Sequence, residues 1–302
     1  ITQIDQAYGK YASIVIDAKS GKTLHEINAD TKNYPASLTK MMTLYLLFEA
    51  LDKGKIKYES YFLVSKRASR RPASKLGLKA KEKISVKNCI LALVVKSAND
   101  VATVVAENLA GTEKGFARMM TKKARQLGMK NSYFKNASGL PNKGQLSTAR
   151  DLSLMARALI KNFPQYYSFF SIREFSFKGR KYKNHNKFLN KYPGADGIKT
   201  GYIHSSGYNL AASALKNGKR LIAVVTGSKT AKQRDRHVAT LLNKSFKKIL
   251  PKNLEVPKKR QLNLSTKPTI KSDGNWEIQV GAFKTFTTAH KTATKAKKQI
   301  SS

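Results

Sequence analysis

The chain has 302 residues, 41% of them hydrophobic, which is enough for one large domain with a sizeable core plus a smaller unit. Its 58 Lys and Arg against 18 Asp and Glu give a formal net charge of +40. That charge indicates either a strongly solvated surface or an anionic partner such as nucleic acid, anionic lipid or an acidic wall polymer. No apolar run approaches the ~18 residues that a membrane-spanning helix needs.

The first part of the chain predicts a β-hairpin followed by a buried helix. Residues 13–17 and 23–27 are rich in strand formers and flank a turn that contains Gly21. The segment from Ser37 to about Lys53 is apolar nearly all round, so we expect an interior helix that begins at Ser37.

The middle of the chain predicts a group of helices. We expect them over residues 86–95, 101–109, 114–127 and 148–161. Residues 96–100 break the first two, and Ser147 is the expected cap of the last. The single cysteine, Cys89, falls on an apolar helix, which favours a packed thiol over a nucleophile or a metal ligand, and no disulfide can form within the chain.

From about residue 173 the pattern changes to strands. We expect them over residues 174–177, 197–202, 208–214 and 220–226. An Asn-Gly pair at 217–218 predicts a tight hairpin between the last two, and residues 236–250 return to a helical pattern. Early and late strands around a helical middle predict an α+β fold: one antiparallel sheet covered by helices, with an all-helical lobe inserted.

The composition changes again at Pro251. Residues 251–273 are basic, contain prolines and lack periodicity, so we expect a linker there. Residues 274–302 alternate like a strand and then favour a helix, as a small α/β module would. These boundaries divide the chain into 1–250, 251–273 and 274–302.

Three short motifs carry most of the chemical information. The first is S-x-x-K at Ser37 to Lys40, whose two polar side chains would lie one helical turn apart. A serine hydroxyl is a weak nucleophile, and a lysine of ordinary pKa cannot accept its proton at neutral pH. Burial and a nearby cation both lower the pKa of a lysine, and the apolar helix and Lys199 could supply them.

By itself S-x-x-K is weak, because the serines at 132, 213 and 245 also fit it in this lysine-rich chain. The second and third motifs, Ser97-Ala98-Asn99 and a Lys-Thr-Gly run that begins at Lys199, occur once each. Their order and wide separation make coincidence a poor explanation. The three together are typical of acyl transfer through a serine ester.

Each remaining motif residue has a chemical role that it could fill. Ser97 can pass a proton between Lys40 and a leaving amine, and Asn99 can both donate to and accept from a peptide backbone, although both residue types are also common at helix breaks. Lys199 and Thr200 would hold a substrate carboxylate on a strand edge, and Gly201 would let an extended ligand lie against the backbone. The backbone N–H groups of Ser37 and Tyr202 are candidates for an oxyanion hole.

The chain resembles the D-alanyl-D-alanine carboxypeptidases, which are low-molecular-mass penicillin-binding proteins of the serine-peptidase type. The resemblance runs from about Tyr11 to Leu250. It rests on the three motifs and on the runs Ser138-Gly139-Leu140-Pro141, Asp196 to Tyr202, and Ser206 to Leu210. The segment from about Gly274 resembles the start of a SPOR domain, a small peptidoglycan-binding module.

The resemblance implies a β-lactamase/DD-peptidase-like fold and a complete reaction. Ser37 would attack the penultimate carbonyl of a peptidoglycan stem peptide that ends in D-Ala-D-Ala, D-Ala would leave, and water would release the acyl group. Penicillins would acylate the same serine, and no metal or cofactor is implied. Such enzymes work outside the cytoplasmic membrane, in the periplasm or cell envelope. The first residues of the chain lack a signal pattern, so an export signal would have been cleaved.

Three alternatives remain open from the sequence. An endopeptidase that cleaves D-Ala-meso-diaminopimelate bonds would carry the same motifs. A β-lactamase is less favoured, because no deacylating glutamate can be placed. The third is a basic protein that binds nucleic acid or wall polymer; we expect no nucleic-acid partner and assign the charge to retention near glycan strands, anionic wall or membrane surface.

Overall fold

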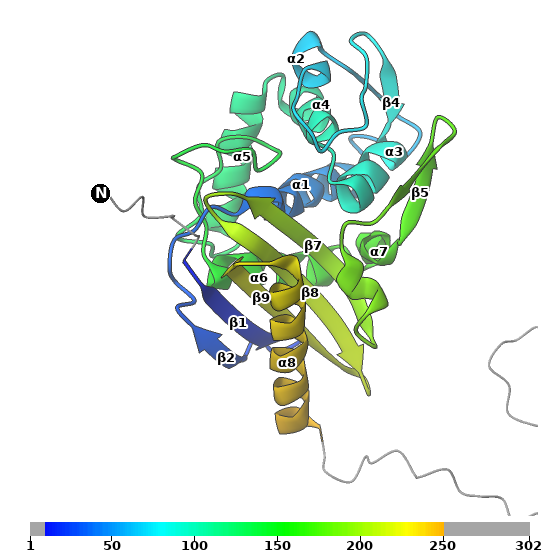
Figure 1. Ribbon diagram of the computed structural model, residues 1–302. Helices are drawn as coiled ribbons and strands as arrows, with labels where there is room; N and C mark the ends of the chain where they lie inside the picture. Colours follow the sequence, from blue (N-terminus) through cyan, green and yellow to red (C-terminus); the bar gives the residue numbers. More distant parts are fainter. Residues whose placement is uncertain (1–9, 251–302) are drawn as a thin grey trace, which may run out of the picture. The chain divides into compact units, whose positions relative to one another are not determined.

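The computed structural model describes residues 10–250, and their element order confirms the predicted α+β fold (Figure 1). The linker expected over 251–273 and the SPOR-like module expected over 274–302 lie outside the described residues. No helix within residues 10–250 combines the length and the apolar character that crossing a membrane requires.

A five-stranded antiparallel sheet with the order β2-β1-β9-β8-β7 forms the centre. Its strands are β1 Ala12–Asp17, β2 Thr23–Ile27, β7 Ala195–Ile203, β8 Gly207–Lys216 and β9 Lys219–Ser228. The first hairpin therefore joins the last one, as expected, with Ile14 opposite Val224. Asn217 and Gly218 both have positive φ, which is the backbone of the primed turn that joins β8 to β9.

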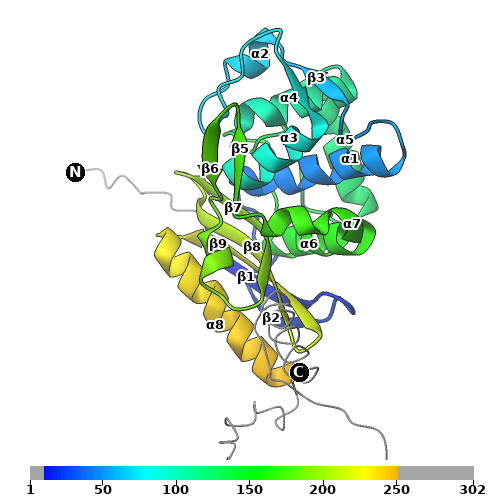
Figure 2. The same ribbon diagram turned by 90° about the vertical axis from the view of Figure 1, so that its right-hand side faces the viewer.

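Helices cover both faces of this sheet (Figure 2). Helix α8, Ala231–Ile249, packs on β8 and β9 through Val238, Leu242 and Phe246, which recur every four residues and so share one face. Helix α6, Ala149–Asn162, packs on β1 and β9 from the other side.

The inserted lobe lies between β2 and β7 in the chain. Its elements are α1 Lys40–Asp52, β3 Tyr61–Leu63, α2 Lys66–Ser69, β4 Lys83–Ser85, α3 Val86–Leu91, α4 Asn99–Ala110 and α5 Glu113–Gln126. Helix α1 packs against α4, α5 and α6, which accounts for its apolar residues on every side. Cys89 is fully buried in α3, as predicted.

A short helix and a hairpin complete the described part. They are α7 Pro164–Tyr167 and the pair β5 Glu174–Phe177 and β6 Arg180–Lys183. The strand predicted at 174–177 therefore pairs only with β6, in a separate two-stranded sheet.

Several predicted helix starts were wrong by a few residues, among them the one expected at 236, since α8 begins at Ala231. Ser37 does not begin α1: it lies in a 3-10 turn, Ala36–Thr39, and α1 begins at Lys40. Ser147 does not cap α6, because its backbone bridges to Asn33 and its hydroxyl bonds to another serine. Thr148 is the cap, and its hydroxyl accepts the backbone N–H of Asp151 at 3.1 Å.

Candidate active site

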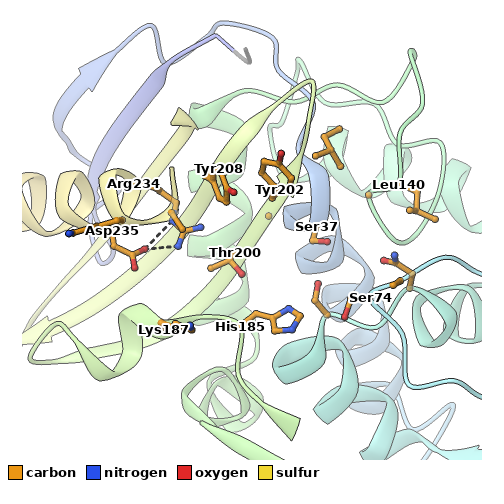
Figure 3. A pocket seen from close by; sticks show the side chains of 18 of the residues that line it. Ser37, Ser74, Leu140, His185, Lys187, Thr200, Tyr202, Tyr208, Arg234 and Asp235 are labelled. Atoms are coloured by element: carbon orange, nitrogen blue, oxygen red, sulfur yellow. Dashed lines mark hydrogen bonds and ion pairs between the residues drawn. The ribbon is translucent and has the colours of Figure 1, made fainter. Parts of the chain in front are cut away.

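The three motifs come together in one cleft of about 630 Å³, where the helical lobe meets the edge strand β7 (Figure 3). The predicted site residues that line it are Ser37, Ser97, Asn99, Thr200, Gly201 and Tyr202. The two predicted lysines, Lys40 and Lys199, lie behind this lining and are 0% and 1% exposed. Segments about 60 and 160 residues apart in the chain therefore meet as the sequence predicted.

Ser37 and Lys40 form the contact that their spacing predicts. The Lys40 Nζ lies 3.0 Å from the Ser37 Oγ. Because Ser37 is in the 3-10 turn, its hydroxyl is half-buried and opens into the cleft, whereas Lys40, on the first residue of α1, points into the protein.

Two further oxygen atoms surround the Lys40 amine: the Asn99 Oδ1 at 2.8 Å and the Ser138 backbone carbonyl. A neutral amine has two N–H bonds and one lone pair. When these two carbonyl-type oxygens accept both N–H bonds, the lone pair faces the hydroxyl of Ser37. The geometry suits an amine that accepts the serine proton.

The environment also favours the neutral amine. Complete burial, followed by the positive charge of Lys199, lowers the pKa of Lys40 well below its usual range, and Asp100 opposes this shift. Both causes were expected from the sequence.

Ser97 follows a π-helical turn, Ala92–Lys96, and has left-handed backbone with φ of 57°. Such a conformation is strained for a residue other than glycine, and strain of this kind concentrates at functional sites. Within residues 10–250 its buried Oγ has no hydrogen-bond partner, although it lines the cleft. The hydroxyl is therefore available to a substrate group.

Asn99 is less available to bind a peptide substrate than the sequence suggested. Its Oδ1 accepts from Lys40, and its Nδ2 donates to the Pro72 carbonyl at 3.1 Å. The amide thus positions Lys40 and the loop at Pro72, which leaves one N–H for a ligand.

On β7, a side chain at Gly201 would crowd the protein itself as well as a ligand. A Cβ at this position would lie 3.0 Å from the backbone nitrogen of Ser37. The edge of β7 therefore lies directly against the turn that carries the nucleophile, and Tyr202 is the next residue on that edge. This proximity places the two predicted oxyanion-hole residues beside each other.

Lys199 is buried and does not line the open cleft, and its Nζ donates to the Thr200 carbonyl at 3.0 Å. Burial, followed by the charge of Arg234, lowers the pKa of Lys199 to about 7. Its side chain therefore acts on the cleft through the charge that it adds near Lys40 and His185.

A loop from the helical lobe closes the site behind Ser37. Ser138 contributes the carbonyl that accepts from Lys40, and Gly139 has φ of +87°. A Cβ on Gly139 would lie 1.8 Å from the Ala36 carbonyl oxygen, a separation that no side chain can occupy. Asn136 fixes the loop, because its Oδ1 accepts the N–H of Gly139 at 2.8 Å.

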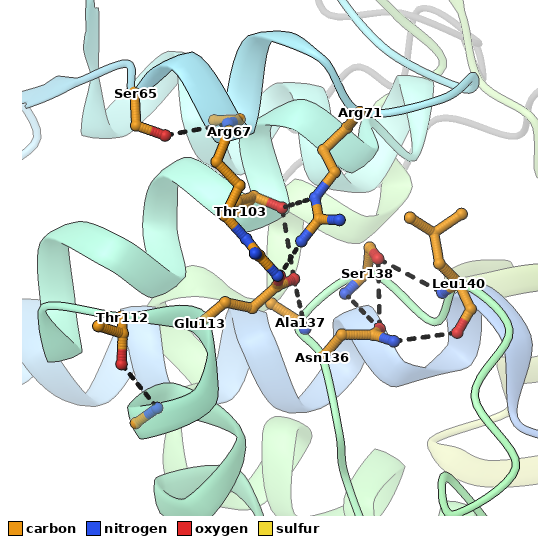
Figure 4. A network of polar contacts seen from close by, with 12 residues as sticks. Ser65, Arg67, Arg71, Thr103, Thr112, Glu113, Asn136, Ala137, Ser138 and Leu140 are labelled. Atoms are coloured by element: carbon orange, nitrogen blue, oxygen red, sulfur yellow. Dashed lines mark hydrogen bonds and ion pairs between the residues drawn. The ribbon is translucent and has the colours of Figure 1, made fainter.

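A buried carboxylate connects this loop to the segment that contains Arg67 and Arg71 (Figure 4). Glu113, 4% exposed at the start of α5, forms ion pairs with Arg67 and Arg71 and accepts from the hydroxyl of Thr103. It also accepts the backbone N–H of Ala137 at 3.3 Å, next to the Ser138 loop. Arg71 immediately precedes Pro72, whose carbonyl holds Asn99.

Sequence reasoning missed several polar residues of the cleft, among them Arg234 and His185. Arg234, 5% exposed at the start of α8, pairs with Asp235 at 2.6 Å and lies beyond Thr200 in Figure 3. His185 lies across from it, and partial removal of its ring from water, followed by the charges of nearby lysines, lowers its pKa to about 4. Neither residue belongs to a pattern that the chain displays, so only the fold could place them.

Comparisons with known proteins agree with this architecture. The described fold is similar to the crystal structure of penicillin binding protein 5 from Haemophilus influenzae, with a TM-score of 0.76, 34% identity, and coverage of 82% of this chain and 73% of that one. It is also similar to penicillin-binding protein D2 from Listeria monocytogenes in its ampicillin-bound form, with a TM-score of 0.72, 31% identity, and coverage of 82% and 100%. The fold is thus that of the low-molecular-mass penicillin-binding proteins.

The sequence itself gives the family. The profile of the Peptidase_S11 family, described as D-alanyl-D-alanine carboxypeptidase, matches residues 4–230. The D-alanyl-D-alanine carboxypeptidase DacF of Bacillus subtilis is 38% identical over 245 residues, which are 80% of this chain. The chain belongs to the Peptidase_S11 family, and its match spans 63% of the length of DacF.

Proposed function

We propose that this chain is a serine-type D-Ala-D-Ala carboxypeptidase that acts on peptidoglycan stem pentapeptides and is acylated by penicillins. The observation that carries the proposal is a fully buried amine of lowered pKa, 3.0 Å from a serine hydroxyl that opens into a cleft beside a Lys-Thr-Gly strand edge. Membership in the family supports the same reaction.

In the proposed acylation, Ser37 attacks the penultimate carbonyl while the neutral Lys40 accepts its proton. The N–H groups of Ser37 and Tyr202 stabilise the negative charge on the carbonyl oxygen. The C–N bond then breaks, and Ser97 passes the proton from Lys40 to the departing D-Ala amine. Water hydrolyses the ester and restores the Ser37 hydroxyl.

Thr200 and Arg234 are the proposed site for the terminal carboxylate. Thr200 lies between Ser37 and Arg234 along the cleft, and the guanidinium keeps N–H groups beyond those that its own contacts use. Lys199 and Gly201 support this end of the site from β7. No metal or cofactor takes part in these steps.

The lining of the cleft supports a peptidase over a β-lactamase. Among the described residues that line it, the single carboxylate is Asp235, which is paired with Arg234 and Lys191. No lining glutamate is positioned to activate water on an acyl-enzyme, so we expect penicillin to be trapped on Ser37 and released slowly.

The proposed localisation of the chain is the cell envelope, outside the cytoplasmic membrane, where peptidoglycan stem peptides are found. The net charge of +40 supports electrostatic retention near an anionic wall or membrane surface. Glycan binding by residues 274–302 is a separate proposal, on residues that the structure does not describe.

The test is labelling with fluorescent penicillin, mapping of the modified peptide, and measurement of D-Ala release from a pentapeptide. We expect label on Ser37, and Ser37→Ala should lose both label and release. Ser245→Ala is the matched control, because Ser245 also fits S-x-x-K but does not line the cleft. Undiminished release by Ser37→Ala would refute the proposal.

A further inference from the structure

The carboxylate of Asp100 is buried beside the active site and has no role in the proposed reaction steps. Asp100 is the second residue of α4, directly after Asn99, and it is 0% exposed. Within residues 10–250 no Lys, Arg or His nitrogen lies within ion-pair distance of it. Burying a charged group without a paired cation is costly unless hydrogen bonds replace the lost water. The hydrogen bonds of this carboxylate therefore show what holds it in place.

The four hydrogen bonds that reach this carboxylate in the described part of the chain come from backbone N–H groups. Its Oδ1 accepts from Leu76 at 3.1 Å, and its Oδ2 accepts from Gly77 at 2.9 Å and from Leu78 at 3.2 Å. The fourth donor is Val101, at 2.9 Å, within α4. Hydrogen bonds to a charged acceptor are among the stronger ones in proteins. Asp100 thus ties the segment before β4 to the start of α4.

The same segment also contacts the Ser97-Ala98-Asn99 motif. We call residues 72–78 the cleft-wall loop, because Ser74, near its centre, lines the cleft. The Ser74 carbonyl accepts the N–H of Asn99 at 2.7 Å, and the Ser74 hydroxyl donates to the Lys96 carbonyl at 2.8 Å. The Pro72 carbonyl accepts from the Asn99 side chain at 3.1 Å. The loop is therefore fixed to the motif at one end and to the carboxylate at the other.

Asp100 also acts on Lys40 through its charge. The residue before it, Asn99, accepts from the Lys40 amine at 2.8 Å. Burial and then the charge of Lys199 lower the pKa of Lys40, and the charge of Asp100 raises it. Because all three charged side chains are buried, little water screens them from one another. The carboxylate thus restores part of the basicity that burial removes from Lys40.

Two other titratable groups near this pair are uncharged at neutral pH. Burial, followed by the charge of Asp100, raises the pKa of the Cys89 thiol in α3. Burial, followed by the charges of Lys199 and other lysines, lowers the pKa of His185 to about 4. Lys199, with a pKa of about 7, and Asp100 are therefore the charges that act on Lys40.

We propose that Asp100 is a positioning residue for acylation, which holds the cleft-wall loop in place and keeps the amine of Lys40 basic enough to take the proton of Ser37. The inference rests on the proposed function, because it concerns the step in which that proton moves. A weakly basic group accepts a proton poorly, and a strongly basic one is already protonated at neutral pH. Burial and the charge of Lys199 prevent the second condition, and the charge of Asp100 prevents the first.

The test is Asp100→Asn, which keeps the shape of the side chain, removes its charge and replaces one acceptor with an amide N–H₂ group. The rate of Ser37 acylation by penicillin is measured against pH. We expect the limb on the acidic side to move to lower pH by about 0.5 unit or more, because a negative charge is removed from beside Lys40. The rate at the plateau should fall at least about threefold, because both the base and the loop are weakened. Lys199→Gln, which removes a positive charge, should move the limb in the opposite direction.

Three further variants separate the effect of the charge from that of the loop. Ser74→Ala removes a hydroxyl that fixes the loop but removes no charge, so acylation should slow while the limb stays in place. Glu59→Gln and Lys122→Gln, the second on the surface of α5, each remove one charge from an exposed position. Neither should change the rate or the limb.

A limb that stays in place in Asp100→Asn, or that moves equally far in Ser74→Ala, overturns the inference. If Asp100→Asn does not fold, hydrogen exchange of the wild-type chain decides: the N–H groups of residues 76–78 should exchange at least about tenfold more slowly than that of Lys75, which has no acceptor within the described residues. Equal exchange rates overturn the attachment of the loop. Penicillin labelling of Ser37 in the wild-type chain separates the two failures, since absent labelling overturns the proposed function itself.

Discussion

Lys40 is the residue on which the proposed chemistry depends most, because its amine must be both buried and neutral. Its pKa is lowered by burial first and by Lys199 second. The second cause is itself titratable, since the pKa of Lys199 is about 7. Below that pH Lys199 carries more of its charge, and a charged Lys199 opposes protonation of Lys40.

Lys199→Gln should therefore change the pH dependence of acylation. Removing the neighbouring charge raises the pKa of Lys40, so more of Lys40 is protonated at a given pH. In a plot of the penicillin acylation rate against pH, the limb on the acidic side should move to higher pH. The measurement is the second-order acylation rate against pH, with Lys122→Gln as control; a limb that stays in place would contradict this role of Lys199.

Gly139→Ala should distort the nucleophile turn and slow acylation at least tenfold, because its Cβ would overlap the Ala36 carbonyl. Gly179→Ala is a close control: it also has positive φ, at 72°, but a Cβ there would meet nothing within 4 Å. Both variants carry the backbone strain of about 1–2 kcal/mol, and only Gly139→Ala adds the clash. Equal acylation rates for the two would show that the close approach is unimportant.

At this scale the sequence predicted the reactive atoms but not all of their surroundings. S-x-x-K spacing was sufficient to place Ser37 and Lys40 in contact, since a 3-10 turn, like an α-helix, brings side chains three residues apart to one face. Arg234 and Glu113 were not predicted, because each reaches the site through contacts between segments far apart in the chain. The engagement of Asn99 by Lys40 and Pro72 likewise depends on the fold.

Among the elements, the 3-10 turn before α1 and the loop at Asn136–Leu140 hold the site, and neither has a repeating pattern that a sequence can reveal. The first predicted helix began three residues too early for this reason. Glu113 joins the loop at Ala137 to Arg71, so one carboxylate holds two segments, each two residues from a residue that lines the cleft.

Glu113→Gln should weaken the attachment of both segments. The variant leaves two arginines without their carboxylate, and breaking a buried ion pair typically costs about 3–5 kcal/mol of unfolding free energy. We expect a clear loss of stability in urea unfolding and slower acylation of Ser37 in the fraction that is folded.

The exposed pair of Glu174 and Lys181 supplies the control. Glu174→Gln should leave both the unfolding midpoint and the acylation rate close to those of the parent chain. If Glu113→Gln lowers stability but its folded fraction acylates at the parental rate, Glu113 stabilises the lobe without positioning the site.

For the molecule as a whole, the net charge of +40 is the feature that the fold does not explain. So many like charges repel one another in the compact state, and added salt screens this repulsion. The overall architecture was predictable because strand and helix periods, the Asn-Gly turn and the apolar α1 all agree with one another. The net charge, by contrast, does not help to predict the fold. Its effect on stability must be measured on the whole chain.

Raising NaCl from low to moderate concentration should raise the Tm. A domain of this size shifts by about 2–4 °C for each 1 kcal/mol of stability, so an increase of a few degrees is expected in differential scanning fluorimetry. Acetylation of surface lysines should reduce the increase. A Tm that falls as NaCl is added would contradict the idea that repulsion between like charges is a major destabilising term for the folded state.

The pairing of β1 with β9 also has a consequence for how the protein is made. Ile14 and Val224 are neighbours in the sheet although roughly two hundred residues of chain separate them. The ribosome therefore releases β1 long before β9 has been synthesised. The nascent chain cannot form the centre of its sheet until then. The central sheet can therefore form only after nearly all of this domain has emerged.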